Sequence, residues 1–220
     1  MFSSQKQLEK LLGLFSTGTK LTYRKGEYII RPGEAPSGVF YIEKGLVKAF
    51  NISKYGEENL LIIRKEQEIF PLIWAITNQE RRIIYQTLSP TIVWRVSHDV
   101  FNDFMHQHPS AIPPLLDMVT EMYKRHSERI LNLEYRTVRE RLISFLLHMS
   151  NRFGEPVQDG SLRLEVPLIH QDIASSINSS RETTSRELAA LERKGLISTS
   201  NSLITLKDEK KLRDYLGDDS

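Results

Sequence analysis

Residues 170–191, HQDIASSINSSRETTSRELAAL, constrain the fold more than any other part of the chain, because they describe two short helices separated by one tight turn. Asn178 tolerates the left-handed backbone conformation that such a turn requires, and Ser179 or Ser180 provides a hydroxyl that caps the following helix. Ala174 supplies the small side chain needed where two helices cross at a sharp angle. The tract therefore predicts a helix-turn-helix.

The second helix of this pair, residues 179–191, carries charged side chains on its outward N-terminal part. In the major groove of DNA an arginine can donate two hydrogen bonds to guanine, and Glu182 can accept one from cytosine. A solvated surface helix with alternating charges is the simpler alternative. The serine cap before the helix, and Gly195 with a β-hairpin after it, favour DNA reading. The predicted DNA-contacting residues are Gln171, Ser180, Arg181, Glu182, Ser185 and Arg186.

Residues 21–96 alternate between short β-rich runs and turn residues, which is typical of an antiparallel sandwich, roll or barrel. Glycines and prolines separate the runs and permit the backbone angles of tight turns. The candidate strands are residues 28–30, 39–42, 46–50, 60–63 and 91–96. We therefore expect an N-terminal antiparallel β-roll of the double-stranded β-helix, or jelly-roll, type.

A helical pattern follows, first at residues 98–108 and then from Pro113 and Pro114 to about residue 133. Side chains in the longer helix recur with the 3-4 spacing of a two-stranded coiled-coil seam, which His126 and Arg129 interrupt. The alternative is that this stripe packs on the chain's own roll. We expect a homodimer. The predicted dimerisation residues are Leu115, Val119, Met122, His126 and Leu133.

These patterns predict an α+β chain in three parts: a β-roll sensor at residues 1–109, a central dimerisation helix at 110–136, and a winged helix-turn-helix at 137–220. In the third part the apolar positions first follow a helix, and a loop containing Gly and Pro then leads into a strand. The helix pair comes next, and a β-hairpin closes the domain.

Composition limits the classes of function. The chain has no cysteine, so it can form no disulfide, iron–sulfur cluster or thiolate metal site, and we predict no metal site. Its formal net charge of +2 is too small for a protein that coats nucleic acid, so any DNA binding has to be local. No apolar run reaches the roughly 18 residues of a membrane span, and the lysines near the N-terminus argue against a signal peptide. We expect a cytoplasmic protein with no membrane partner.

A β-roll can also house metal-dependent enzymes, whose metal is held by histidines on strands inside the barrel. No histidine precedes His98, so such a cage cannot be built here. We predict that the chain is not an enzyme.

SRETTSREL, followed by LERKGLI, resembles the winged helix-turn-helix of the Crp/Fnr family of bacterial transcriptional regulators. KGEYIIRPGEAPSGVFYIEKGLVKAF is similar to the cyclic-nucleotide-binding-type β-roll of that family. The resemblance implies a homodimer in which an effector repositions two recognition helices on a pseudo-palindromic operator of double-stranded DNA. It also implies base contacts by Arg181, Glu182 and Arg186, with Ser185 modifying the preferred site. RNA polymerase is the implied second partner, through the loop at residues 53–59.

The sensor departs from the family pattern at IFPLIWAITNQERRIIYQT. Arg81 aligns with the family's phosphate-binding arginine, but Arg82 replaces the small hydroxyl residue and no Gly-Glu pair precedes it. Because cyclic AMP would lose hydrogen bonds to a charged group, we expect no response to cyclic AMP. A different small effector is expected, with an exposed arginine pair and a purely structural aromatic core as the alternatives. The candidate effector pocket consists of Trp74, Arg81, Arg82, Tyr85, His126 and Ser127.

Two further alternatives concern the effector. A regulator that is active whenever it dimerises needs no effector, and nothing in the sequence excludes it. A haem-based gas or redox sensor of the same family would use one of four histidines, although histidines on helix surfaces are usually only polar residues. These are His98, His106, His108 and His126. No cofactor is required by the sequence.

Overall fold

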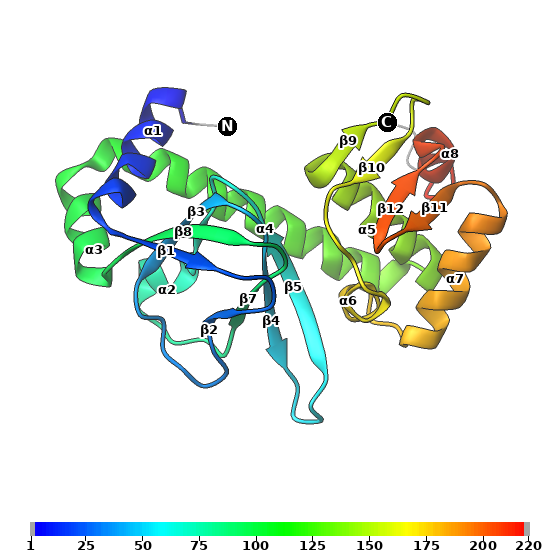
Figure 1. Cartoon of the computed structure of the whole chain (residues 1–220), viewed down its shortest axis with the longest axis horizontal. Coiled ribbons are helices and arrows are strands. Elements are labelled where there is room, and N and C mark those ends of the chain that lie inside the picture. Colours follow the sequence, from blue (N-terminus) through cyan, green and yellow to red (C-terminus); the bar gives the residue numbers. More distant parts are fainter. Residues whose placement is uncertain (1–2, 218–220) are drawn as a thin grey trace. The chain divides into compact units, whose positions relative to one another are not determined.

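The computed structural model describes residues 3–217, which fold into two compact units. Unit 1 comprises the residues up to Asn51 together with Leu61–His126, and unit 2 comprises Ile52–Leu60 together with the residues from Ser127 onward. Antiparallel sheets, a long helix and a helix-turn-helix follow one another along the chain (Figure 1), which confirms the expected α+β class. The first two and last three residues of the predicted domains lie outside the described part.

Two four-stranded sheets form the β-roll of unit 1, with the strand orders β1-β8-β3-β6 and β2-β7-β4-β5. The pairings of β8 with β1 and β3, and of β7 with β2 and β4, are antiparallel. All five predicted strands are present, and β1, β6 and β7 complete the sheets. The bounds are β1 (Thr19–Tyr23), β2 (Tyr28–Ile30), β3 (Val39–Lys44), β4 (Val47–Ile52), β5 (Glu58–Arg64), β6 (Ile69–Phe70), β7 (Ile84–Thr87) and β8 (Thr91–Val96).

Apolar side chains from both sheets share one core, because alternate residues of a strand point to the same face. Phe70 stacks on Phe40 of its own sheet and on Tyr85 of the other, with ring centroids 5.2 and 4.7 Å apart. Gly45 closes the β3–β4 turn with a φ of +103°, and a Cβ atom there would lie 2.6 Å from the carbonyl oxygen of Pro90. This turn therefore requires glycine.

The segment between β6 and β7 contains a short helix, α2 (Leu72–Thr77), which the sequence analysis did not predict. Asn78 ends it in the left-handed conformation, and residues 78–83 have no regular structure. A short apolar run does not distinguish a strand from a helix by periodicity, which explains the omission. Trp74 therefore lies on a helix, whereas Arg81 and Arg82 lie on an irregular connection.

A second core in unit 1 joins the roll to helices near both ends of the unit. Leu11, Phe101 and Leu115 are buried together there, and Leu115 is only 7% exposed. Leu115 is therefore packed in the core of its own unit, and its part in a dimer seam stays a prediction. The helices are α1 (Gln5–Gly13), η1 (Leu14–Thr17), α3 (His98–Gln107), η2 (Pro109–Ala111) and the start of α4 (Ile112–Tyr135).

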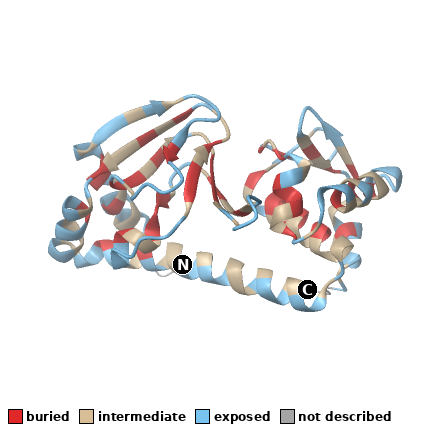
Figure 2. Cartoon of the chain, turned by 90° about the horizontal axis from the view of Figure 1, so that it is seen from below, coloured by how far each residue is buried: buried red, intermediate tan, exposed pale blue. Residues whose placement is uncertain are grey.

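Most of helix α4 is not buried. Pro114 and Leu115 are its only buried residues, and Figure 2 shows the rest of this long helix, at the bottom of the view, as exposed or half-buried. An apolar face nevertheless runs along it with 3-4 spacing. Three predicted seam residues share this face, but Met122 does not, since its Sδ accepts a hydrogen bond from Arg64 at 3.8 Å. The face consists of Ile112, Leu116, Val119, Tyr123, His126, Ile130 and Leu133.

Unit 2 contains a four-stranded sheet of order β11-β12-β10-β9 and the helix pair expected from the sequence. Leu142 and Leu146 of α5 are fully buried in the core of this unit. A capping box between Thr137 and Glu140 begins α5, with hydrogen bonds in both directions. The bounds are α5 (Val138–Phe153), β9 (Gly154–Pro156), β10 (Leu162–Leu164), α6 (His170–Ser176), α7 (Arg181–Arg193), β11 (Ile197–Ser200), β12 (Leu203–Leu206) and α8 (Glu209–Asp214).

Candidate DNA-reading site

Helices α6 and α7 meet through the tight turn that the sequence predicts. Asn178 has a φ of +50°, and the N–H of Ser179 donates to the carbonyl oxygen of Ala174 at 3.0 Å. The Ser180 side chain caps α7 by accepting from the N–H of Thr183 at 3.1 Å. Ala174 is 1% exposed where the helices pack. The turn therefore holds the start of α7 in one orientation.

The outward side of α7 carries three long charged side chains. Arg181, Glu182 and Arg186 are exposed, whereas Leu188 and Leu191 anchor the opposite side in the core with 3 and 1% exposure. The backbone that carries the charges is thus fixed from behind, and the charges remain accessible. This arrangement suits side chains that reach into a groove of DNA.

Two hydroxyl groups of the predicted set are engaged within the protein. Ser185 Oγ lies 2.6 Å from His170 Nδ1 at the start of α6, and Ser180 Oγ is occupied by its cap. Arg186 donates from Nη2 to Thr183 Oγ1 at 3.1 Å, which orients its guanidinium along α7. Ser185 therefore orients α6 against α7, a role that sequence reasoning missed. The side chain of Gln171 is exposed on α6.

A polar hairpin follows the reading helix. Gly195 ends α7 with a φ of +68°, and its N–H donates to the carbonyl oxygen of Glu192 at 2.8 Å. Asn201 and Ser202 both have positive φ and form the exposed tip between β11 and β12. The N–H of Leu168 donates to the carbonyl oxygen of Ser202 at 3.0 Å, which ties this wing to the segment before α6.

The candidate effector residues are partly brought together in unit 1. Burial raises the pKa of Tyr85, and the positive charges of Arg64 and Arg81 oppose that shift. Arg64 was not predicted. Its side chain is 5% exposed, it pairs with Glu68 at 3.2 Å, and its Nε has no hydrogen-bond partner among the described residues. In the sequence Arg64 follows a predicted apolar strand, and nothing in that pattern indicates that its side chain is buried.

The other candidates are more dispersed. Trp74 packs on His98 with ring centroids 4.8 Å apart, which gives it a structural contact within unit 1. Arg82 is exposed. His126 is the last residue of unit 1 and Ser127 the first residue of the second segment of unit 2, and both are half-buried.

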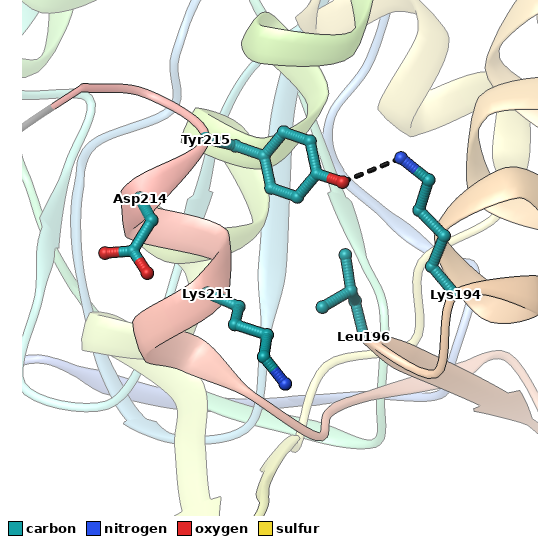
Figure 3. Close-up of a pocket in the computed structure, with 5 residues that line it drawn as sticks. All are labelled: Lys194, Leu196, Lys211, Asp214 and Tyr215. Carbon is teal, nitrogen blue, oxygen red and sulfur yellow. Dashed lines mark hydrogen bonds between the residues drawn. The ribbon is translucent and has the colours of Figure 1, made fainter.

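A pocket of about 540 Å³ lies in unit 2 beside α8 (Figure 3). Lys194 lies over the ring of Tyr215 and donates to its hydroxyl at 2.7 Å, and Lys211 pairs with Asp208 at 3.0 Å. Both ammonium groups are thus engaged within the chain. None of the predicted functional residues lines this pocket. Its lining consists of Lys194, Leu196, Lys211, Asp214 and Tyr215.

Residues 3–217 contain no group of three or more His, Asp or Glu side chains placed to hold a metal ion. None of the helices described is both long and apolar enough to cross a membrane.

Comparison with known proteins accounts for both units. Residues 20–108 match the cyclic nucleotide-binding domain, and residues 140–215 match the Crp-like helix-turn-helix domain. The global nitrogen regulator of Synechocystis sp. is 29% identical over 187 residues, covering 84% of this chain and 83% of that protein. The anaerobic regulatory protein of Haemophilus influenzae is 24% identical over 215 residues, covering 97% and 82%.

Solved structures share the fold. A CooA mutant from Carboxydothermus hydrogenoformans superposes with a TM-score of 0.77 at 22% identity, covering 98% of each chain. FixK2 from Bradyrhizobium japonicum gives 0.77 at 22% identity, covering 90% of this chain and 96% of that one. Family domains in both units, relatives over most of the chain and this common fold lead to one conclusion: the chain belongs to the Crp/Fnr family of DNA-binding transcriptional regulators, which are not enzymes.

Proposed function

We propose that this regulator binds a pseudo-palindromic operator as a homodimer and reads each half-site with Arg181, Glu182 and Arg186. The observation that carries the proposal is the exposed charged side of α7, held from behind by buried leucines and capped by Ser180. Arginine donates to guanine and glutamate accepts from cytosine, so the half-site should contain G·C pairs. To Gln171 and the Ser180 backbone we assign phosphate contacts, which would position the helix without reading sequence.

In vitro selection from a random DNA library tests this proposal. The selected sites should be two-fold symmetric, with half-site centres about one helical turn, roughly 34 Å, apart. Selection of single, unpaired half-sites, or of no sequence at all, would contradict the dimeric reading.

For the homodimer we propose the exposed apolar face of α4 as the seam. Ile112, Leu116, Tyr123 and Ile130 are 47, 52, 72 and 58% exposed, and a run of exposed apolar side chains along one face marks an interaction surface. Its 3-4 spacing is that of a coiled coil, for which a second copy is the matching partner. Of the residues predicted from sequence, Val119, His126 and Leu133 keep their place in this seam.

The proposed division of labour places the sensor in residues 1–109, dimerisation in 110–136 and DNA reading in 137–220. We expect the protein to work in the cytoplasm, where its DNA lies, and to contact RNA polymerase through the exposed loop around residues 53–59. Tyr55 is 77% exposed in that loop, and an exposed aromatic side chain is typical of a protein-binding surface.

For the effector we propose a small anion other than a cyclic nucleotide. The positive charges of Arg64 and Arg81 both act on Tyr85, and a carboxylate or phosphate oxygen would satisfy the Arg64 Nε donor, which has no hydrogen-bond partner among the described residues. A thermal-shift screen of small carboxylates and phosphates tests this, since a ligand of the native state raises the melting temperature with occupancy. The shift should disappear in the R64Q variant. No shift with any compound would favour a constitutive regulator, and a Soret band after growth with haem would favour a haem sensor.

A further inference from the structure

The tip of the β4–β5 hairpin, residues 52–60, belongs to unit 2 together with the helix-turn-helix. Strand β4 begins in unit 1 and strand β5 ends there. The hairpin tip between them is grouped with the DNA-reading unit instead. An arginine on α4, Arg129, contacts this tip, and the same residue interrupts the coiled-coil seam predicted from the sequence.

Arg129 donates three hydrogen bonds to two separate segments. Its Nη1 donates to the carbonyl oxygen of Leu60 at 3.1 Å, and its Nη2 donates to Asn59 Oδ1 at 3.0 Å and to the carbonyl oxygen of Ser175 at 3.1 Å. The two segments also bond directly, since the N–H of Leu60 donates to Ser175 Oγ at 3.1 Å. Ser175 Oγ in turn donates to the carbonyl oxygen of Asp172 within α6 at 3.0 Å. These contacts form one closed network, which we call the Arg129 clasp.

The clasp is sensitive to position. Burial lowers the pKa of Arg129 because its charge is partly removed from water, and the acceptors given above are neutral oxygens. A buried guanidinium is tolerated only while its donors are satisfied. Its planar fork also fixes the directions of the acceptors, as a lysine would not. A shift of Leu60 or of Ser175 therefore leaves partly buried donors of Arg129 unpaired, which favours opening of the whole network.

Both attached segments lead to functional parts of the chain. Ser175 lies near the C-terminal end of α6, three residues before the turn residue Asn178. Leu60 lies on β5, four residues from Arg64, or about 13 Å along a strand. The clasp thus connects the strand that carries Arg64 to the helix that orients α7.

We propose that Arg129 is a positioning residue, which fixes α6 to the β4–β5 hairpin tip and so makes the orientation of the DNA-reading helix pair depend on the placement of strand β5. Its effect on DNA affinity rests on the proposed reading by α7, but its effect on the geometry of unit 2 does not.

The test separates these two effects. Because the chain has no cysteine, Y55C and K210C place two spin labels unambiguously, one on the hairpin tip and one on α8. The label-to-label distance should be sharply distributed in the parent and broad in R129Q. Affinity for the selected operator should fall about tenfold or more in R129Q, since up to three partly buried hydrogen bonds of a charged group are lost. R129K should recover part of the sharp distance distribution and part of the operator affinity, because lysine keeps the positive charge but lacks the planar guanidinium.

K124Q is the matched control, since it removes one positive charge from an exposed position on the same helix. It should leave the distance distribution and the operator affinity unchanged. If R129Q fails to fold, N59A and S175A each remove one acceptor oxygen from the clasp, and both should broaden the distance.

An unchanged distance in R129Q, or in both N59A and S175A, would overturn the clasp. A broadened distance with full operator affinity would overturn the positioning role. If the parent itself selected no operator, the proposed function would fail, while the distance measurement would still decide whether the clasp exists.

Discussion

Helix α7 and the connection at residues 78–83 both present exposed arginines, but the backbone behind them differs. Arg181 and Arg186 stand on a helix whose opposite side is buried, whereas Arg81 and Arg82 stand on a segment without regular structure. A fixed backbone lowers the conformational entropy lost on binding and sets the direction of each donor. Exposed charge on a helix anchored in the core can therefore read bases, whereas no helix or strand sets the directions of the two sensor arginines.

Helix α7 is held in place by its buried leucines, and L188A should loosen it. The leucine is 3% exposed, so the cavity should lower the free energy of unfolding of unit 2 by about 2–5 kcal/mol. Urea denaturation followed by circular dichroism measures the change. E192A, at an exposed position of the same helix, should stay within about 0.5 kcal/mol of the parent. Equal stability of the two variants would show that Leu188 does not anchor α7 in the core.

Two rigid readers act together only if the chain dimerises. I130D places a carboxylate in the proposed α4 seam, so it should give a monomer and weaken operator binding by about 100-fold through lost avidity. Sedimentation equilibrium and fluorescence anisotropy measure the two effects. L131D makes the same change at the neighbouring residue, which is 52% exposed but lies outside the 3-4 face, and should remain dimeric. A dimeric I130D would refute the seam.

Single substitutions by alanine on the charged side of α7 test which residue reads which base pair. E182A and R186A should each cost about 1–3 kcal/mol at the selected operator and relax the preference at one base pair. Binding to unrelated DNA should change little, because it depends mainly on phosphate contacts. Competition assays at fixed salt concentration compare the sites. Parental affinity in both variants would mean that this helix does not read bases.

Helix α5 packs against the helix pair, and a capping box at Thr137 begins it. T137A should lower the free energy of unfolding by about 1 kcal/mol near neutral pH. Hydrogen bonds from Thr137 lower the pKa of Glu140, so this contribution is present above the ordinary glutamate pKa and is lost as pH falls through the lowered value. Denaturation curves should therefore separate parent from T137A more at neutral pH than in acid, where only the bond from the Glu140 N–H to Thr137 Oγ1 remains. A constant difference would exclude the carboxylate's part in the cap.

For the sensor half, the smallest effect is expected from R81Q and R82Q. Without effector, both should bind the operator within about twofold of the parent, because exposed charges outside the DNA-reading unit contribute little to the stability of that unit. With an anionic effector that shifts the melting temperature, R81Q should weaken that shift and R82Q should not, since Arg81, like Arg64, acts electrostatically on Tyr85. A stronger loss in R82Q would place the ligand elsewhere.

The sequence alone predicted the helix pair, its charged face and the β-roll, because each depends on local signals. Asn178 takes a backbone conformation that few residues tolerate, Ser180 caps the next turn, and the periods of apolar residues distinguish the helices from most strands. Such features are set by residues close together in the chain.

Only the tertiary structure decided which side of α4 is free, where Arg64 lies and what Arg129 holds. Leu115 and Leu116 are equally apolar, yet one is 7% and the other 52% exposed, because the N-terminal helix and α3 cover one side of α4. The partners of Arg129 are 46 to 70 residues away along the chain. Periodicity describes the spacing of side chains on one helix, but not which distant segment packs against it, because that contact is a property of the folded chain.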